Sequence, residues 1–287
     1  MMKALPVLAV LWALLCCPAC RAQTDTLLVL QAPAAVRSVI TFDITTDAGS
    51  SKAVSRLIYD SSVTPSGSEL LAETEGPRGS ALSQSAVRRA SIPFELTPRG
   101  MRLLPAKDKL FIGDNMSEAA TVPQLSLPDG PVTPLASLAR GSGDFRQQAA
   151  ASRWTGQVIN PFSGTVLKTV CTLVSVRDGV ASISAASQKP DTGKGVLTMD
   201  SLDRQKKELG SRFALTFRDY EGTADVSYTA FFTFDIQKGQ VLKAQENYYI
   251  TGILMPHGQP ITVADAKEKD LYITIAIKID HNKVQGD

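Results

Sequence analysis

The sequence predicts a mainly β protein, a curved antiparallel meander sheet or half-barrel with few short helices, and it leaves open whether the sheet consists of two related halves. Two observations lead to this fold class. Long stretches of the second half alternate apolar and polar residues, which is the period of a strand and not of a helix. Short polar pairs that contain glycine separate those stretches, as in tight turns between neighbouring antiparallel strands.

The alternation is strongest near the C-terminal end of the chain. In residues 271–279 every second side chain is aliphatic, so a strand there places all of them on one face. Residues 226–236 and 213–217 show the same period with aromatic and aliphatic side chains. Apolar groups also occupy the opposite phase, for example Phe231 next to Phe232. We therefore expect one face to pack the core, and the other either to be buried as well or to line a groove.

Three turns are predicted between the late strands, at residues 177–179, at Glu221 with Gly222, and at Lys238 with Gly239. Their glycines can adopt the positive φ that such turns require. Because each turn joins strands that follow one another in the chain, we expect those strands to pair as a meander.

The first half has weaker strand patterns and longer loops that are rich in Ser, Gly, Pro and Ala. We expect strands at 27–31, 36–46, 53–61, 92–96 and 101–104, loops at 62–85 and 114–147, and short helices at 144–152 and 202–209. The loop at 114–147 contains four prolines, which suits an extended crossing between the halves. The predicted organisation is a leader, residues 1–22, an N-terminal β-rich half, residues 23–147, and a C-terminal antiparallel β half, residues 148–287.

The first 22 residues have the layout of a secretory signal peptide. Lys3 precedes an apolar run of 12 residues from Ala4 to Leu15, and small residues follow it. A membrane-spanning helix needs roughly 20 residues, so we expect no transmembrane span. Cleavage after Ala22 would leave a soluble chain, whereas lipidation of Cys20 would anchor it to a membrane; both alternatives stay open. In either case we expect export to the periplasm or cell envelope.

Charge and cysteine content argue against two further classes of protein. The leader contains Lys3 and Arg21 of the 30 basic residues and none of the 28 acidic ones, so the mature chain is close to neutral. A neutral chain lacks the field of a nucleic-acid-binding protein. Cys171, which is alone in the mature chain, alternates with Leu167 and Leu173. We expect it to be a buried core residue and not a nucleophile.

Motifs for catalysis and metal binding are missing from the sequence. His257 and His281 stand in separate turn-like contexts, and no metal-ligand spacing, nucleophile elbow or phosphate loop surrounds them. We therefore expect no catalytic residue, no metal and no cofactor, and the pattern identifies no ligand-binding residue.

One hairpin pattern carries a resemblance to a known family. Residues 94–100, Phe-Glu-Leu-Thr-Pro-Arg-Gly, are similar to residues 234–239, Phe-Asp-Ile-Gln-Lys-Gly, and long strands follow the second copy. With the signal peptide, residues 205–280 resemble bacterial envelope proteins that have a half-β-barrel like that of the lipoprotein carriers. The resemblance implies a curved sheet around an apolar cavity or a covering helix, and it assigns no functional residue.

The leading functional hypothesis is an exported, non-enzymatic envelope protein that binds an apolar ligand or lipid in its curved sheet. The alternative is a structural or protein-interaction module of the envelope that recruits another envelope protein through a sheet edge. An unrecognised hydrolase is a third hypothesis, and it requires clustered carboxylates or a Ser–His pair inside a pocket.

Overall fold

The computed structural model describes residues 25–31, 36–48, 51–75, 87–97, 100–104, 118–134, 152–161, 163–191, 198–217, 220–256, 263–268 and 271–283. Within these residues, twelve strands form one antiparallel sheet with the order β5-β4-β3-β2-β1-β12-β11-β10-β8-β7-β6, and β9 pairs with β10 beside this path. The mainly β fold class is therefore confirmed.

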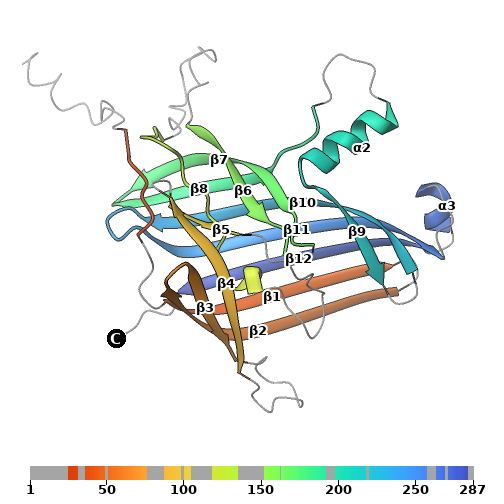
Figure 1. Cartoon of the computed structure of the whole chain (residues 1–287), viewed down its shortest axis with the longest axis horizontal. Coiled ribbons are helices and arrows are strands. Elements are labelled where there is room, and N and C mark those ends of the chain that lie inside the picture. Colours follow the sequence, from red (N-terminus) through yellow and green to blue (C-terminus); the bar gives the residue numbers. More distant parts are fainter. Residues whose placement is uncertain are drawn as a thin grey trace, which may run out of the picture.

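The strands are β1 Val36–Ala48, β2 Ser51–Ser66, β3 Glu69–Thr74, β4 Arg88–Thr97, β5 Gly100–Leu103, β6 Arg153–Ile159, β7 Val166–Arg177, β8 Val180–Ser187, β9 Arg212–Phe217, β10 Tyr220–Asp235, β11 Gln240–Pro256 and β12 Tyr272–Lys283. Most strands pair with their neighbours in the chain. The exceptions are β8, which pairs with β10, and β1, which pairs with β12. The β1–β12 pair makes one continuous sheet from both parts of the chain (Figure 1). The division into two halves at residue 147 stays a prediction.

Helical structure is short within the described residues. It comprises the 3-10 turn η1 Glu118–Thr121 and the helices α2 Met199–Glu208 and α3 Val263–Glu268. The side chain of Thr198 caps α2 by accepting a hydrogen bond from the Ser201 amide. The helix predicted at 202–209 is thus confirmed, with its start three residues earlier.

The sheet curves until it is nearly closed, like a barrel. In Figure 1 the long strands β1, β2 and β10 to β12 run side by side, and β4 and β6 cross in front of them. Residues 101–103 of β5 and residues 157–159 of β6 line one cavity of about 170 Å³. The two ends of the sheet therefore lie on either side of this cavity. Residues 121–127, which we call the strap, lie between them and are mostly buried.

The inner face of the sheet forms the core. The alternating residues of β12 are buried from Ile273 to Ile279, as their period predicts. A large cluster around these residues is joined by a smaller one beneath β3 and β4, made of Val63, Leu70, Ala72, Ile92, Phe94 and Val122. Because the strap supplies Val122 to the smaller cluster and Leu125 and Leu127 to the larger one, it is part of the core.

The structure confirms two of the three predicted turns. Asp178 and Gly179 join β7 to β8 with φ values of 50° and 77°, which is the left-handed conformation of a tight hairpin. Gly239 joins β10 to β11 with a φ of 60°. The turn predicted at Glu221 and Gly222 is wrong, because both residues lie inside β10 and pair with β9. Strand β9 ends at Phe217 and pairs with β10 from Tyr220 onward, and the two residues that join these strands lie outside the described residues.

Two predictions for the first half are also wrong. Residues 27–31 form no strand; only Thr26 makes an isolated bridge, to Val132 of the proline-containing crossing. The loop predicted at 62–85 is replaced in part by the end of β2 and by β3, whose burial alternates despite its polar residues. The helix predicted at 144–152 lies almost entirely outside the described residues.

The alternation makes a direct prediction for two adjacent residues of β10. Phe232 is fully buried, whereas Phe231 is 43% exposed on the outer face. We expect Phe232→Ala to lower the free energy of unfolding by about 3–5 kcal/mol, because it leaves a cavity in the core. The control Phe231→Ala should lower it by about 1 kcal/mol or less. Urea unfolding of the mature protein measures both, and equal losses would contradict the assigned faces.

Candidate functional site

Polar residues interrupt the apolar inner face where β10, β11 and β12 lie side by side. They are Tyr228 of β10, Glu246 and Tyr248 of β11, and His281 of β12, and each is at most 2% exposed. Tyr228 lies directly opposite Tyr248 in the sheet, and His281 lies opposite Ala244, one inward position from Glu246. With Gln124 of the strap, these residues form what we call the interior polar cluster.

One oxygen of Glu246 is well supplied with hydrogen bonds. Its Oε1 accepts from the backbone N–H of Gln124 at 2.8 Å and from the hydroxyl of Tyr228 at 3.3 Å. The side-chain amide of Gln124 also donates to the Tyr248 hydroxyl at 3.3 Å. Such bonds offset the large free-energy cost of burying a carboxyl group. The strap therefore holds Glu246 in place from across the barrel.

The strap itself is bound to the edge of β6 by side chains that act as a neighbouring strand would. The Gln124 amide donates to the carbonyl of Ile159 at 2.9 Å, and its oxygen accepts from the Ile159 N–H at 2.6 Å. Ser126 repeats the pattern at Gln157, with distances of 2.8 Å and 3.0 Å. These bonds occupy an otherwise open sheet edge. This end of the sheet is thus less suited to recruiting another strand.

A glycine in β6 allows the strap to approach this closely. A Cβ atom at Gly156 would lie 2.8 Å from Cβ of Ser126, 2.7 Å from Oγ1 of Thr169 and 2.9 Å from Sγ of Cys171. All three distances are shorter than real Cβ contacts, so a side chain there would push the strap away from the sheet.

The other half of the cluster lacks such partners. Both ring nitrogens of His281 and Oε2 of Glu246 are buried without a hydrogen-bond partner among the described residues. The distance from His281 Nε2 to Glu246 Oε2 is 3.9 Å, which is too long for a hydrogen bond. Because an unsatisfied buried polar group costs about 1–3 kcal/mol, this arrangement calls for a functional explanation.

His281 also lines an apolar pocket that is partly open to solvent. The pocket has a volume of about 80 Å³ and lies between the ends of β1, β11 and β12, the strap, and the smaller core cluster. Its walls are made mainly by Leu30, Val36, Val63, Leu70, Val122 and Val241. Lys283, two residues after His281, also lines the pocket and donates to Gln240 at 2.8 Å. The pocket thus joins apolar walls to a histidine whose buried ring nitrogens have no hydrogen-bond partner in the described part of the chain.

The two tyrosines of the cluster are hydrogen-bonding groups and not bases. Burial, and then the nearby Glu246 carboxyl group, raise the pKa of Tyr228 and of Tyr248 well above its usual value. Their rings contact each other with centroids 4.9 Å apart. Tyr228 therefore keeps its proton and donates a hydrogen bond to Glu246.

The sequence interpretation of the histidines was wrong for His281 and is untested for His257. His281 is an inward residue of β12 and not part of a turn. His257 lies outside the described residues, as does Cys20, whose lipidation stays a prediction. The signal for the cluster was in the alternation, because Glu246 falls in phase with Ala244 and Tyr248, and His281 continues the aliphatic phase of β12.

The structure also shows where Cys171 and the outward-facing aromatic residues lie. Cys171 is 1% exposed inside the core, and burial raises the pKa of its thiol to about 11, so its prediction as a core residue is confirmed. The face opposite the core was expected either to be buried or to line a groove. On that face, Phe231 and Tyr249 are exposed and line neither of the two cavities, so neither alternative is found at these residues. In the part of the chain that the structure describes, no group of metal-ligating residues gathers, and no helix could cross a membrane.

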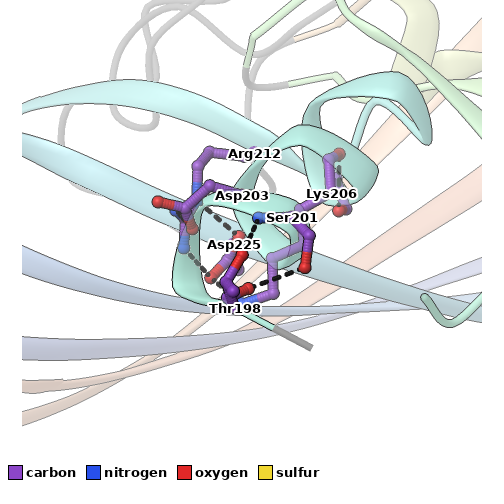
Figure 2. A network of polar contacts seen from close by, with 7 residues as sticks. Thr198, Ser201, Asp203, Lys206, Arg212 and Asp225 are labelled. Carbon is purple, nitrogen blue, oxygen red and sulfur yellow. Dashed lines mark hydrogen bonds and ion pairs between the residues drawn. The ribbon is translucent and has the colours of Figure 1, made fainter. Parts of the chain in front are cut away.

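A second polar network lies at α2 and has a structural role. Figure 2 shows Arg212 of β9 between Asp203 of α2 and Asp225 of β10, with Lys206 on the same Asp225 carboxylate. The distances to Asp225 are 3.0 Å from Arg212 and 2.8 Å from Lys206. Every group is paired and partly exposed, so the network fixes α2 to the sheet and leaves no free group for a ligand.

Comparison with known proteins adds no family. No family model matches the chain, and no curated protein matches it. Among solved structures, two dehydratase domains from the CurJ module of the curacin polyketide synthase are similar, one of them an inactive mutant in complex with a compound. They are 9% and 10% identical, each with a TM-score of 0.13 and coverage of 86% of this chain and 75% of theirs. At this TM-score the likeness supports neither a fold nor a function.

The α2 network predicts a dependence of stability on pH. Burial alone would raise the pKa of Asp225, but hydrogen bonds from Arg212 and Lys206 outweigh it and hold the pKa below its usual value. The stabilisation is therefore present above pH 4 and is lost as the pH falls through the lowered pKa of the folded state. We expect Asp225→Asn to lower the free energy of unfolding by about 1 kcal/mol at pH 7 and by less at pH 3.

Urea unfolding at the two pH values measures this difference. The control Asp178→Asn changes an exposed acid that has no ion pair among the described residues, in a turn that asparagine also tolerates. It should show little effect at either pH. A loss for Asp225→Asn that is as large at pH 3 as at pH 7 would contradict the ionic role.

Proposed function

We propose that this chain is an exported, non-enzymatic protein of the cell envelope that binds a small aliphatic ligand in the pocket beside His281. One observation supports this proposal above the others: an apolar, partly open pocket ends at a buried histidine whose nitrogens have no partner among the described residues. Binding sites of this kind combine apolar walls with a few polar groups that orient the ligand.

The size of the pocket limits what it can hold. Its volume of about 80 Å³ is roughly half that of an engineered 150 Å³ cavity that binds benzene. A short aliphatic chain, or the end of a longer one, suits this space better than a ring system does. Burying such a chain contributes about 0.8 kcal/mol for each CH₂ group.

A hydrolase is the second candidate, and one observation favours it. Ser38 of β1 lines the same pocket as His281, and Glu246 lies on the far side of His281 in the adjacent strand. However, neither ring nitrogen of His281 is hydrogen bonded to Ser38. An activated serine requires that bond, so binding is the better supported proposal. Labelling of Ser38 by a fluorophosphonate probe would support the hydrolase instead.

Pocket-filling and surface variants of matched chemistry test the binding proposal. We expect the mature protein to bind C4–C10 alcohols or fatty acids, measured by calorimetry or ligand-observed NMR. Val36→Phe places a ring at the pocket wall and should weaken binding by at least about tenfold, because it removes the space for several CH₂ groups.

The control Val54→Phe makes the same change at a residue that is 72% exposed, and it should bind as the unmodified protein does. The proposal would be wrong if no aliphatic probe bound and native mass spectrometry of gently purified protein found no lipid.

A further inference from the structure

We propose that the ligand of the pocket beside His281 carries a carboxylate, which the ammonium group of Lys283 binds, so that the protein takes short-chain fatty acids. The inference rests on the proposed binding function and names the head group of the ligand. The carboxylate lies where β1 and β12 meet, at Lys283 and Ser38, and the aliphatic chain lies against the apolar walls.

The residues that line the pocket include cations and no carboxylate. Two lysines, Lys243 and Lys283, are among them, whereas no Asp or Glu of the described residues lines the pocket. Charges of one sign beside apolar walls of low dielectric attract a ligand of the opposite sign. A negatively charged head group therefore suits this pocket better than a neutral or a positive one.

Of these two lysines, Lys283 is the one that the sheet turns inward. It continues the inward phase of β12 after Ile279 and His281, and it is partly buried. Lys243 lies in the outward phase of β11, next to the buried Ala244, and is exposed. Because successive side chains of a strand point to opposite faces, Lys283 and not Lys243 extends over the inner face, where the pocket lies.

Lys283 belongs to a row of polar residues that crosses the inner face of the sheet. From strand to strand it is followed by its partner Ser38 of β1, then by Ser61 of β2 and Thr74 of β3. Ser38, like Lys283, is partly exposed and lines the pocket. Ser61 and Thr74 are buried and do not line it. A ligand in the pocket therefore meets this row at Lys283 and Ser38.

The hydrogen-bonding groups at this position match a carboxylate. The ammonium group of Lys283 has three N–H donors, one of which donates to Oε1 of Gln240 at 2.8 Å. No carboxylate of the described residues forms an ion pair with Lys283, so its other donors are available to a ligand. The hydroxyl of Ser38 is a further donor. A carboxylate accepts several hydrogen bonds, and those from an ammonium group are strengthened by charge.

The hydrogen bond to Gln240 also orients Lys283 before a ligand binds. Gln240 begins β11 directly after Gly239, whose carbonyl accepts a hydrogen bond from the backbone N–H of Gln31 at 3.0 Å. Ordering a free lysine side chain costs conformational entropy. A lysine that is already held in place loses less of it on binding, which favours tight binding of the head group.

The apolar walls extend away from Lys283 across the sheet. In the order of strands, β2, β3 and β5 follow β1 on the side away from β12. These strands and the strap contribute mainly apolar residues to the pocket, namely Val63, Leu70, Met101, Val122 and Pro123. The pocket therefore has a cation on one side and apolar side chains on the other, which suits a ligand with one charged end.

Three probes with the same chain and different head groups test the role of charge. Hexanoate, 1-hexanol and hexylammonium are negative, neutral and positive at pH 7. We expect the mature protein to bind hexanoate at least about tenfold more tightly than 1-hexanol, because Lys283 adds charge-assisted hydrogen bonds. Hexylammonium should bind more weakly than 1-hexanol. Calorimetry or ligand-observed NMR measures all three.

Lys283→Met removes the ammonium group and keeps an unbranched side chain. We expect hexanoate to bind this variant at least about tenfold more weakly, since the charge-assisted hydrogen bonds are lost. Binding of 1-hexanol should be unchanged, which also shows that the variant folds and keeps the pocket. The control Lys278→Met changes a lysine on the outer face of the same strand, and it should leave the binding of both probes unchanged.

The outcomes separate the two proposals. If 1-hexanol binds as tightly as hexanoate, or if Lys283→Met leaves hexanoate binding unchanged, the pocket holds chains without recognising a carboxylate, and only this inference fails. If hexylammonium binds most tightly, this inference fails as well. If none of the three probes binds, the proposed binding function fails with it. The three probes on the unmodified protein decide the matter where Lys283→Met does not fold.

Discussion

The carboxyl group of Glu246 is the constraint on which the arrangement of the inner face depends. It lies at a position that the alternation of β11 turns toward the core, where a carboxyl group without hydrogen bonds would be strongly destabilising. The strap supplies one partner and β10 supplies another. Because Gln124 also binds the edge of β6, the same residue satisfies the carboxyl group and occupies the sheet edge. The near-closure of the sheet and the placement of the polar cluster are thus linked.

Some polar groups of the interior polar cluster have their hydrogen bonds satisfied, and others do not. Oε1 of Glu246 and the two tyrosine hydroxyls take part in hydrogen bonds with one another or with the strap. The ring nitrogens of His281 and Oε2 of Glu246 are buried without a partner among the described residues, and His281 lines the pocket. Proteins tolerate such a loss of stability mainly where function requires the group. The α2 network shows the contrast, since all of its charged groups are paired. The unsatisfied polar groups of these two clusters therefore lie inside the sheet and not in the charged network at its surface.

The sequence predicted the strands whose two faces differ most. The aliphatic period of β12 and the Asp178–Gly179 turn are local signals, and both were confirmed. The turn before β10 was misplaced, because Gly222 is a strand residue there and the favoured turn chemistry pointed to the wrong residues. Strand β3 was missed because its residue types do not alternate with its burial: Leu71 is apolar but exposed, and Thr74 is polar but buried.

The site could be predicted only in part. The positions of Glu246 and His281 in the inward phase were visible, but nothing local shows that two residues 35 positions apart lie 3.9 Å from each other. That distance follows from the pairing register of β11 with β12. The role of the strap was hidden for a similar reason. Residues 121–127 have the composition of a loop, and their contribution to the core depends on the curvature of a sheet formed by strands far away in the chain.

The free energy of unfolding of His281→Leu tests most directly whether His281 serves function and not stability. Leucine is similar in size to histidine and removes two buried nitrogens that have no hydrogen-bond partner among the described residues. We expect the variant to be as stable as the unmodified protein or more stable, by up to about 2 kcal/mol, in urea at pH 7 without ligand. A loss of more than about 2 kcal/mol would show that His281 stabilises the fold and would contradict its assignment to a ligand.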